Sequence, residues 1–563
     1  MITNFLKIIF FCLIFFNQNI AFSQNSQKAF NKEKIANYFS SLISYNNNEN
    51  QQFLNFFDSS RLTKDSNKEY VSQYLVSLIL EGKIAKAISK AKIIKGNELN
   101  MSYETGILLA IDNLKNKKYK DFFYSIDELN IYKKEDGLQR IILSSLEEFT
   151  YLFYNKNINR KINNNFGQLT VINKAFQECY LGSSSTKNLF YNALNAEKGD
   201  YSRYLFFYVS FLISQGKIDE AKSISEEIDI LSSSLIAAQT KEWIQKEKFE
   251  NFNKIFSCKN PQDIISEFFY LIATLYSAEE DIKSSNFYLS ISNYLNPKFE
   301  FNLSLFVENY FERENFELSE FYLKKFQRDN PIYYWYKLKK KAEIIKKKKD
   351  INSSFNFIYS EFTKIKSPSL RVIFDIANIT KNFERYELSI QYYSKLLENL
   401  DEESLLYADI LYRRGSCYER LGEYKKADKD FLYSLEINED SYTLNYLAYS
   451  WLERNYKVDT AIQMLEKANK INKNDPYIID SVGWGYYLTQ DYIKAEIFLR
   501  KAVMLMPDDP IVNDHYGDVL WKLNRKLQAN YFWKNVLTLE NTKDKMKNDI
   551  NLKLFNGPKK IKK

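Results

Sequence analysis

The sequence predicts an all-α protein, an α-solenoid in which antiparallel helix pairs stack at a 34-residue period. The 563 residues include only 14 Gly and 8 Pro, whereas a sheet-rich fold needs these residues at frequent turns. Alanine recurs at steps of 34 residues, at Ala427, Ala461, Ala495 and Ala529. A chain of this length also exceeds what one hydrophobic core usually holds, which favours a repeat array or several domains.

Further columns of matched size follow the same period. Large apolar residues recur at Phe431, Leu465, Leu499 and Trp533, and a small-residue column carries glycine in three of the four units. Small residues at these positions let two helices approach closely. The residues predicted to pack helix against helix are Gly415, Ala427, Ala461, Gly483, Ala495, Gly517 and Ala529.

Each unit reads as two helices. Apolar residues recur three and four apart on both sides of a break at Leu421-Gly422, where Gly422 suits the end of the first helix. Pro476 and Pro510 stand where the next first helices should begin, a place at which a helix tolerates proline. Such a pair cannot bury its apolar face alone, so the units are expected to stack.

These residues resemble the tetratricopeptide repeat, most closely from about 405 to 540, where they are similar to C-terminal repeats of exported bacterial tetratricopeptide proteins. The unit around Trp451 departs from the pattern, with a longer turn and its small residue at Ala448. "EGKIAKA" (81–87) and "QGKIDEA" (215–221) echo the repeat upstream. We therefore expect a divergent helical solenoid over 24–400, about four well-formed repeats over 401–540 and a Lys-rich tail over 541–563.

The N-terminus has the layout of a secretory signal peptide over residues 1–23. Lys7 precedes an apolar run from Ile8 to Phe16, and Ala21-Phe22-Ser23 supplies small residues around a cleavage point. The run is short for a membrane span. The prediction is export to the bacterial periplasm; the alternative is an uncleaved segment that anchors the chain to the inner membrane.

Positive charge is concentrated at the C-terminal end. The net charge is +8, and residues 541–563 alone hold eight Lys against Asp544 and Asp549. A nucleic-acid footprint would cover a face of the folded body, so no nucleic-acid partner is expected. The tail is interpreted as a disordered solubilising end, with peripheral contact to anionic lipid as the alternative. The Lys run at 337–349 is interpreted as a solvated helix face.

Cysteine and histidine patterns give no catalytic or metal site. Apart from Cys12, the cysteines are Cys179, Cys258 and Cys417, an odd number at wide spacing, which favours buried thiols, although an oxidising compartment would permit a disulfide. His515 is the only histidine and is interpreted as hydrogen-bonded at a repeat junction. Gly483-Trp484-Gly485 lacks the strand and third glycine of a phosphate loop. We expect no metal, no cofactor and no enzyme activity.

The resemblance implies a binding groove lined by the first helix of each unit. The side chains beside the small column are aromatic with acidic edges, and the sequence carries no signal of oligomeric state. We expect a non-catalytic scaffold of the cell envelope that binds a protein or peptide there; the alternatives are an enzyme or ligand-binding domain in the irregular N-terminal half, and lipid or nucleic-acid association through the basic segments. The predicted partner-binding residues are Tyr412, Tyr449, Asp480, Trp484, Tyr487, Asp514, Asp518 and Trp521.

Overall fold

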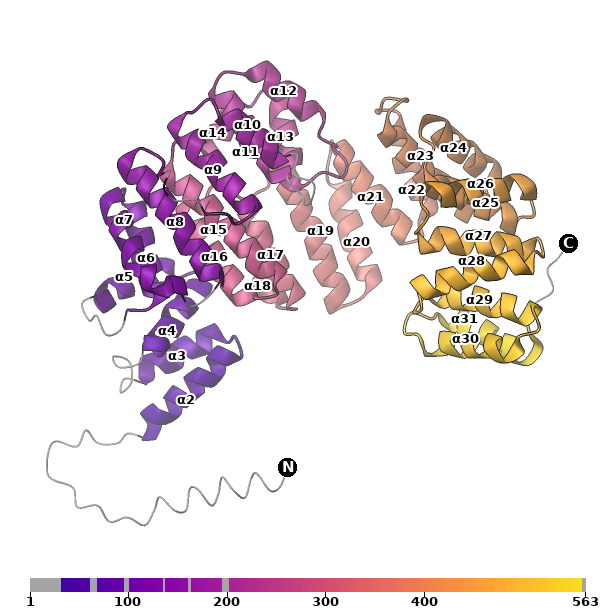
Figure 1. Ribbon diagram of the computed structural model, residues 1–563, viewed down its shortest axis with the longest axis horizontal. Helices are drawn as coiled ribbons and strands as arrows, with labels where there is room; N and C mark the ends of the chain where they lie inside the picture. Colours follow the sequence, from indigo (N-terminus) through magenta and orange to yellow (C-terminus); the bar gives the residue numbers. More distant parts are fainter. Residues whose placement is uncertain are drawn as a thin grey trace, which may run out of the picture. The chain divides into compact units, whose positions relative to one another are not determined.

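The protein is helical throughout the part that the computed structural model describes, residues 32–60, 68–95, 101–134, 137–159, 161, 164–194 and 202–558 (Figure 1). These residues form α-helices and one 3-10 helix, with no strand among them. The all-α prediction is thereby confirmed. The predicted signal peptide, residues 1–23, lies outside the described residues, as do Lys559–Lys563.

The chain divides into two compact units. The N-terminal unit runs to Ile228 and includes Ser233–Lys337, whereas the C-terminal unit comprises Asp229–Ser232 and the chain from Leu338 onward. The change from faint to clear repeats near residue 400 is therefore not the boundary between units, because the helix pair before residue 401 belongs to the C-terminal unit.

In the N-terminal unit, neighbouring helices pack as antiparallel hairpins, most extensively α15 with α16, α2 with α3 and α17 with α18. Its helices are α2 (Lys32–Asn46), α3 (Asn50–Ser59), α4 (Lys68–Leu80), α5 (Ile84–Lys95), α6 (Tyr103–Lys115), α7 (Tyr119–Asp127), η2 (Glu128–Lys134), α8 (Gly137–Asn155), α9 (Gln168–Leu181), α10 (Thr186–Leu194), α11 (Ser202–Ser214), α12 (Ile218–Glu226), α13 (Leu235–Gln245), α14 (Glu250–Ile255), α15 (Pro261–Ala278), α16 (Ile282–Leu295), α17 (Phe301–Glu312), α18 (Phe316–Leu323) and α19 (Pro331–Lys348), which includes the boundary.

In the C-terminal unit the helices alternate as first and second members of pairs. The pairs are α21 with α22, α23 with α24, α25 with α26, α27 with α28 and α29 with α30. The helices are α20 (Ile351–Thr363), α21 (Leu370–Asn382), α22 (Tyr386–Leu397), α23 (Leu405–Arg420), α24 (Tyr424–Ile437), α25 (Ser441–Glu453), α26 (Val458–Ile471), α27 (Pro476–Leu488), α28 (Tyr492–Leu505), α29 (Pro510–Lys522), α30 (Lys526–Thr538) and α31 (Asp544–Asn556).

The helix ends follow from local chemistry. Pro476 and Pro510 begin α27 and α29 as predicted, and the Asp before each caps the helix by accepting hydrogen bonds from backbone N–H groups of its first turn. Gly422 follows α23 with a left-handed φ of 75°. Gln490 and Asn524 take the same conformation at the corresponding turns, so this turn geometry recurs where glycine is absent.

The residues of the small columns lie where two helices meet. A Cβ added to Gly483 would lie 2.6 Å from Cγ of Leu499, and one on Gly517 would lie 2.4 Å from the indole Nε1 of Trp533. A Cβ on Gly415 would come within 3.1 Å of the Phe431 ring. Ala427, Ala461, Ala495 and Ala529 are all buried in the same core. Close helix–helix approach therefore depends on these small side chains.

Two cysteines depart from the sequence prediction. Cys179, in α9, and Cys258, just before α15, form a disulfide across 79 residues, with their Cα atoms 5.7 Å apart. The prediction of buried thiols is wrong for this pair, because the fold brings together positions that sequence spacing cannot relate. It holds for Cys417, a buried free thiol in α23 whose pKa burial raises to about 11.

Removing this crosslink should destabilise the N-terminal unit. We expect Cys179→Ser with Cys258→Ser to lower the free energy of unfolding by about 2–4 kcal/mol, because the disulfide restricts the unfolded chain. Urea denaturation with and without a reducing agent measures the effect. The reductant should destabilise the natural protein and leave the double variant unchanged; equal effects on both would contradict the assignment.

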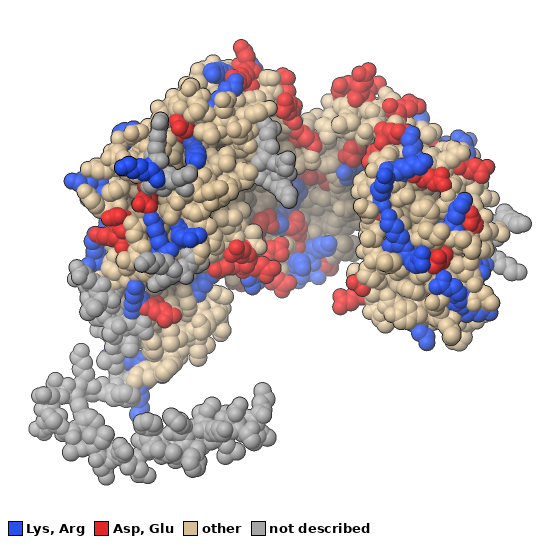
Figure 2. All heavy atoms as spheres, viewed as in Figure 1, with Lys and Arg blue, Asp and Glu red and all other residues tan. Residues whose placement is uncertain are grey.

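Basic side chains are also spread over the folded body, and Figure 2 shows a run of Lys and Arg on the visible face of the C-terminal unit. In the Lys run of α19, Lys339 pairs with Asp375 at 2.8 Å and Lys340, 9% exposed, pairs with Glu343 at 2.6 Å. The predicted solvated face therefore applies to only part of this run, including the exposed Lys346 and Lys347.

Candidate binding surface on the first helices of the C-terminal unit

The first helices form a continuous row. α25 contacts α27 directly, and α27 contacts α29, whereas the second helices make no contacts of that extent with one another in the described part of the chain. The first helices therefore lie closer together and line the inner side of the stack. This row of α25, α27 and α29 (Figure 1) carries the predicted partner-binding residues except Tyr412, which lies on α23.

A buried ion-pair geometry joins α27 to α29. Nδ1 of His515 lies 2.9 Å from Oδ2 of Asp480, and each side chain is only 9% exposed. The other carboxylate oxygen of Asp480 is buried without a hydrogen-bond partner. The interpretation of His515 as a hydrogen-bonded residue at a repeat junction is confirmed.

Trp484 connects three first helices. Its ring stacks on His515 of α29 at 4.0 Å and on Tyr487 of α27 at 4.7 Å, with 15° between the planes in both pairs. Its indole Nε1 donates a hydrogen bond of 2.8 Å to Glu453 at the end of α25. Trp484 remains partly exposed, so part of its ring can contact a partner while the rest holds the row together.

The acidic surroundings of His515 determine its protonation. Burial alone would lower its pKa, but the charges of Asp480, Asp514 and Asp518 outweigh burial and raise the pKa above its ordinary value. The folded state therefore holds the proton more tightly than the unfolded chain does. This contribution to stability is fully present below the unfolded pKa of 6.5 and is lost as pH rises through the raised folded pKa.

A variant without the imidazole isolates this effect. We expect the natural protein to be more stable than His515→Gln by a margin that is largest near pH 6 and shrinks as pH rises through the raised pKa of His515, because the folded protein then releases the proton. Thermal unfolding midpoints of both proteins from near pH 6 upward measure the margin. A margin that does not change with pH would show that the Asp480–His515 pair is not charged in the folded state.

A second acidic cluster, Asp514 and Asp518, pairs with a lysine of the last described helix. Nζ of Lys553, in α31, lies 2.6 Å from Oδ1 of Asp514 and 2.7 Å from Oδ1 of Asp518, both in α29. Nε1 of Trp533 donates to the same Asp518 oxygen at 3.2 Å. After α31, Gly557 turns with a φ of 71° and packs against the Trp521 ring. The helix of the tail therefore covers the end of the first-helix row.

Helix α31 corrects the prediction that the Lys-rich tail is disordered. Residues 544–556 form α31, which packs on α30, and Ile550 is fully buried. In the 34-residue register, α31 corresponds to the first helix of a further pair. The polar residue Asn551 occupies the position of Gly483 and Gly517, the glycines against which the second helix packs in the two preceding pairs. The interpretation of a disordered end is wrong for these residues, because Lys553 and Ile550 both find buried partners.

Three of the predicted partner-binding residues are buried, and two more are partly occupied by the chain itself. Asp480, Tyr487 and Asp518 are 6%, 2% and 3% exposed, so direct contact with a partner is wrong for these three. Asp514 pairs with Lys553, and Gly557 packs against the ring of Trp521, but both residues keep some exposure. The sequence places them correctly on the row but does not reveal that neighbouring helices occupy them.

The other three predicted residues, Tyr412, Tyr449 and Trp484, are partly exposed and lie away from the C-terminal segment that contacts Asp514 and Trp521. Tyr412 lies against Phe431 and Tyr446, at 5.9 and 5.8 Å between ring centroids. Exposed apolar side chains also stand at the beginnings of α25, α27 and α29. These are Tyr442, Tyr477 and Ile511, exposed by 53%, 58% and 54%.

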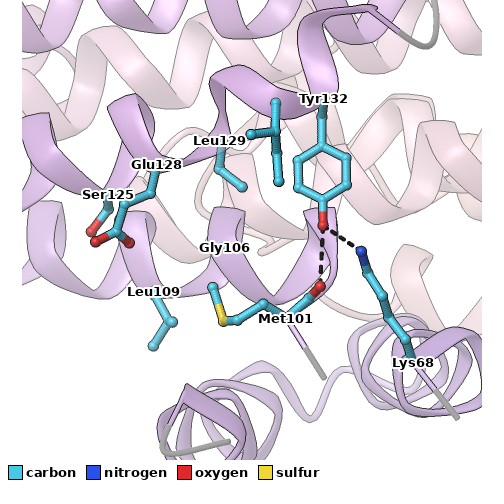
Figure 3. A pocket seen from close by; sticks show the side chains of 9 residues that line it. Lys68, Met101, Gly106, Leu109, Ser125, Glu128, Leu129 and Tyr132 are labelled. Atoms are coloured by element: carbon cyan, nitrogen blue, oxygen red, sulfur yellow. Dashed lines mark hydrogen bonds between the residues drawn. The ribbon is translucent and has the colours of Figure 1, made fainter. Parts of the chain in front are cut away.

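The described part of the N-terminal unit has two cavities, of about 200 and 530 Å³, and ligand pockets usually have roughly 300–1,000 Å³. The larger one lies at the start of α9 and beside α10. Figure 3 shows the smaller one, which is below that range. Lys68 donates to Tyr132, whose hydroxyl donates to the Met101 carbonyl, while Ser125 and Glu128 lie on the other side. Its lining residues are Lys68, Met101, Gly106, Leu109, Ser125, Glu128, Leu129, Ile131 and Tyr132.

The described residues contain no group of three or more His, Cys, Asp or Glu placed to hold a metal ion. Among the same residues, no helix combines the length and the apolar character that crossing a bilayer requires.

Comparison with known proteins identifies the repeat. Residues 408–441, which cover most of α23, α24 and the start of α25, match the family model of the tetratricopeptide repeat. Residues 408–441 form a tetratricopeptide repeat. A TPR repeat-containing protein of Pseudomonas aeruginosa is 31% identical over 111 residues, which is 20% of this chain and 19% of that protein.

Solved tetratricopeptide structures resemble parts of the chain. A tetratricopeptide repeat protein from Parabacteroides merdae is 17% identical, with a TM-score of 0.38, and the match covers 45% of this chain and 98% of that one. A thermophilic TPR protein from Thermus thermophilus is 17% identical, with a TM-score of 0.29, covering 33% and 99%. MamA from Desulfovibrio magneticus is 18% identical, with a TM-score of 0.27, covering 32% and 99%.

Proposed function

We propose that this tetratricopeptide-repeat protein is a non-catalytic scaffold of the bacterial cell envelope, which holds a segment of a partner protein on the first helices of its C-terminal unit. The observation that carries the proposal is the row of accessible aromatic side chains on successive first helices. Tyr442 and Tyr449 lie on α25, and Tyr477 and Trp484 lie on α27. Large aromatic side chains are the residues that most often dominate binding energy at protein interfaces.

The pairing of the acidic side chains bears on the chemistry of the partner segment. Three of the predicted acidic contacts, Asp480, Asp514 and Asp518, already face His515 or Lys553, so they offer little attraction to Lys or Arg on a ligand. Glu453 is exposed but accepts the Trp484 indole N–H. The partner segment is therefore expected to contribute apolar or aromatic side chains, with basic residues of secondary importance.

Two features support export to the periplasm. The N-terminal residues follow the pattern of a secretory signal. The pairing of Cys179 with Cys258 suits an oxidising compartment, because disulfides persist outside the cytosol. Membrane anchoring by an uncleaved N-terminal segment remains the alternative, and comparing the N-terminal residue of the purified natural protein with the predicted start at Gln24 distinguishes the two.

Substitution of the accessible aromatics tests the binding surface. We expect Tyr449→Ala with Trp484→Ala to lower the yield of partner proteins captured after cross-linking in the cell by about tenfold or more, since hot-spot residues contribute at least about 2 kcal/mol each. The matched control is Gln463→Ala with Lys467→Ala, because both side chains are exposed on the second helix α26. An unchanged set and yield of partners, with helicity preserved by circular dichroism, would contradict the proposal.

A further inference from the structure

The second helices of the last two pairs expose large apolar side chains. Ile493, Ile497 and Met504 lie on one face of α28 and are exposed by 68%, 52% and 75%. One repeat later, Leu527 and Tyr531 occupy the same positions of α30 and are exposed by 88% and 70%. Five large apolar side chains thus stand outward on two consecutive second helices.

Basic side chains accompany them and outnumber the acidic ones, of which Asp491 caps α28 and pairs with Lys494 at 3.3 Å. Helix α30 contains no Asp or Glu at all, and the only acidic residue of α28, Glu496, has a side chain that is 15% exposed and pairs with Arg525 at 3.2 Å. The exposed basic residues of the two helices are Lys494, Arg500, Lys501, Lys526 and Lys534. We call these five and the five apolar residues together the outer face.

The preceding pair shows that the repeat does not require this composition. In α26, Asp459 and Gln463 stand where α28 has Ile493 and Ile497, and Lys470 stands in place of Met504. All three α26 side chains are exposed. Solvated polar residues therefore satisfy these positions, and packing of the stack does not explain the apolar side chains of the outer face.

We propose that the outer face docks on the surface of a bilayer that contains anionic lipids. Apolar side chains that enter the acyl boundary, surrounded by Lys and Arg that reach lipid phosphates, are the composition of peripheral membrane-binding surfaces. The site is separate from the first-helix row and does not depend on the proposed partner there. It is also separate from the Lys-rich end of the chain at 559–563, because all ten residues belong to α28 and α30.

The arrangement favours a membrane over other occupants. Side chains exposed by 52–88% project from the surface instead of lining a depression, so a protein partner would have to supply the pockets, whereas a bilayer needs none. A second copy of the same face would bring five positive charges against five others. Nucleic acid would need aromatic platforms for bases, and the outer face has only Tyr531.

Flotation of the full chain with vesicles tests the proposal. The measured quantity is the difference in partition between vesicles with 30% phosphatidylglycerol and pure phosphatidylcholine vesicles. All proteins compared carry the same N-terminal segment, so vesicle binding by that segment does not account for differences between them. The first variant, Ile493→Asp with Ile497→Gln, copies the residues of α26, which keeps it compatible with the fold. The second variant adds Lys501→Gln and Lys534→Gln, and the control replaces Lys559, Lys560, Lys562 and Lys563 by Gln.

We expect the first variant to weaken anionic-vesicle binding by about tenfold, the second by a further factor of about ten or more, and high salt to remove much of the difference. The control should keep most of the binding. The proposal is overturned if both outer-face variants bind as the natural protein does, if the control alone abolishes binding, or if the natural chain does not prefer anionic vesicles. Helicity by circular dichroism and binding to an acidic peptide and to DNA are measured in parallel; a preference for either over the vesicles also overturns it.

Discussion

Glu267→Gln is expected to destabilise the N-terminal unit by about 3–5 kcal/mol, because it leaves a buried guanidinium without its counter-charge. Nε and Nη2 of Arg203 lie 2.7 and 2.5 Å from the two carboxylate oxygens of Glu267, and both residues are buried. The guanidinium stacks on Tyr270 at 3.7 Å. Its remaining polar partner is Asn302 at 3.0 Å, while Nη1 has none, so water cannot compensate for the lost charge.

Urea denaturation followed by circular dichroism gives the loss of stability. Replacing both members of the pair, Arg203→Met with Glu267→Met, should recover most of it, because removing both charges also removes their desolvation cost. As a surface control, Lys467→Gln breaks the exposed pair with Glu439 and should cost less than about 1 kcal/mol. Glu267→Gln within that same limit would show that Arg203 is not held in a closed, dry environment.

Lys553→Met is expected to release α31 from α29 at a cost of about 3 kcal/mol at neutral pH, since it leaves Asp514 and Asp518 side by side without their cation. The pKa of Asp518 is raised to about 6 in the natural protein, because burial and the charge of Asp514 outweigh the opposing charge of Lys553. Without Lys553 this carboxyl takes up its proton at higher pH, so the cost should shrink as pH falls toward 6 and the repulsion disappears. Ile550 is the one fully buried side chain of α31 in the described chain, with Met546 and Leu554 partly buried against the same core, so the Lys553 ion pairs are expected to supply a large part of its attachment.

Hydrogen exchange in the full chain measures the release. Amides of residues 544–556 should exchange about a hundredfold faster in Lys553→Met, as a loss near 3 kcal/mol implies, while those of α27 and α28 keep their protection. Lys545→Met, an exposed lysine on the same helix, serves as the control and should leave exchange unchanged. Equal protection of α31 in both variants would mean that Lys553 does not hold the helix.

The repeat architecture could be predicted because it depends on local and periodic signals. The spacing of Ala427, Ala461, Ala495 and Ala529 identifies the packing columns, and Pro476 and Pro510 mark helix starts that the structure reproduces. Each of these signals acts within one helix pair. Helical periodicity and size matching are therefore enough to find them.

The binding residues could only be predicted in part, because their availability depends on the next helix in the stack. The sequence places Asp514, Asp518 and Trp521 on the row, but it does not show that Lys553, 35 residues after Asp518, lies between the carboxylates. His515 was recognised as a junction residue, yet its stacking on Trp484 depends on ring orientation. The pairing of Cys179 with Cys258 likewise requires the path of the chain in three dimensions.

The central claim is that a partner segment lies on the first helices of the C-terminal unit. Photo-cross-linking in the cell tests it most directly, with a photoreactive phenylalanine analogue placed singly at Tyr442, Tyr449 or Gln463. Tyr442 and Tyr449 lie on the first helix α25, and the exposed Gln463 lies on the second helix α26 of the same pair. We predict one common adduct from both first-helix positions, weakened by Trp484→Ala, and none from Gln463. Adducts of equal yield from Gln463, or adducts from Gln463 alone, would contradict the claim.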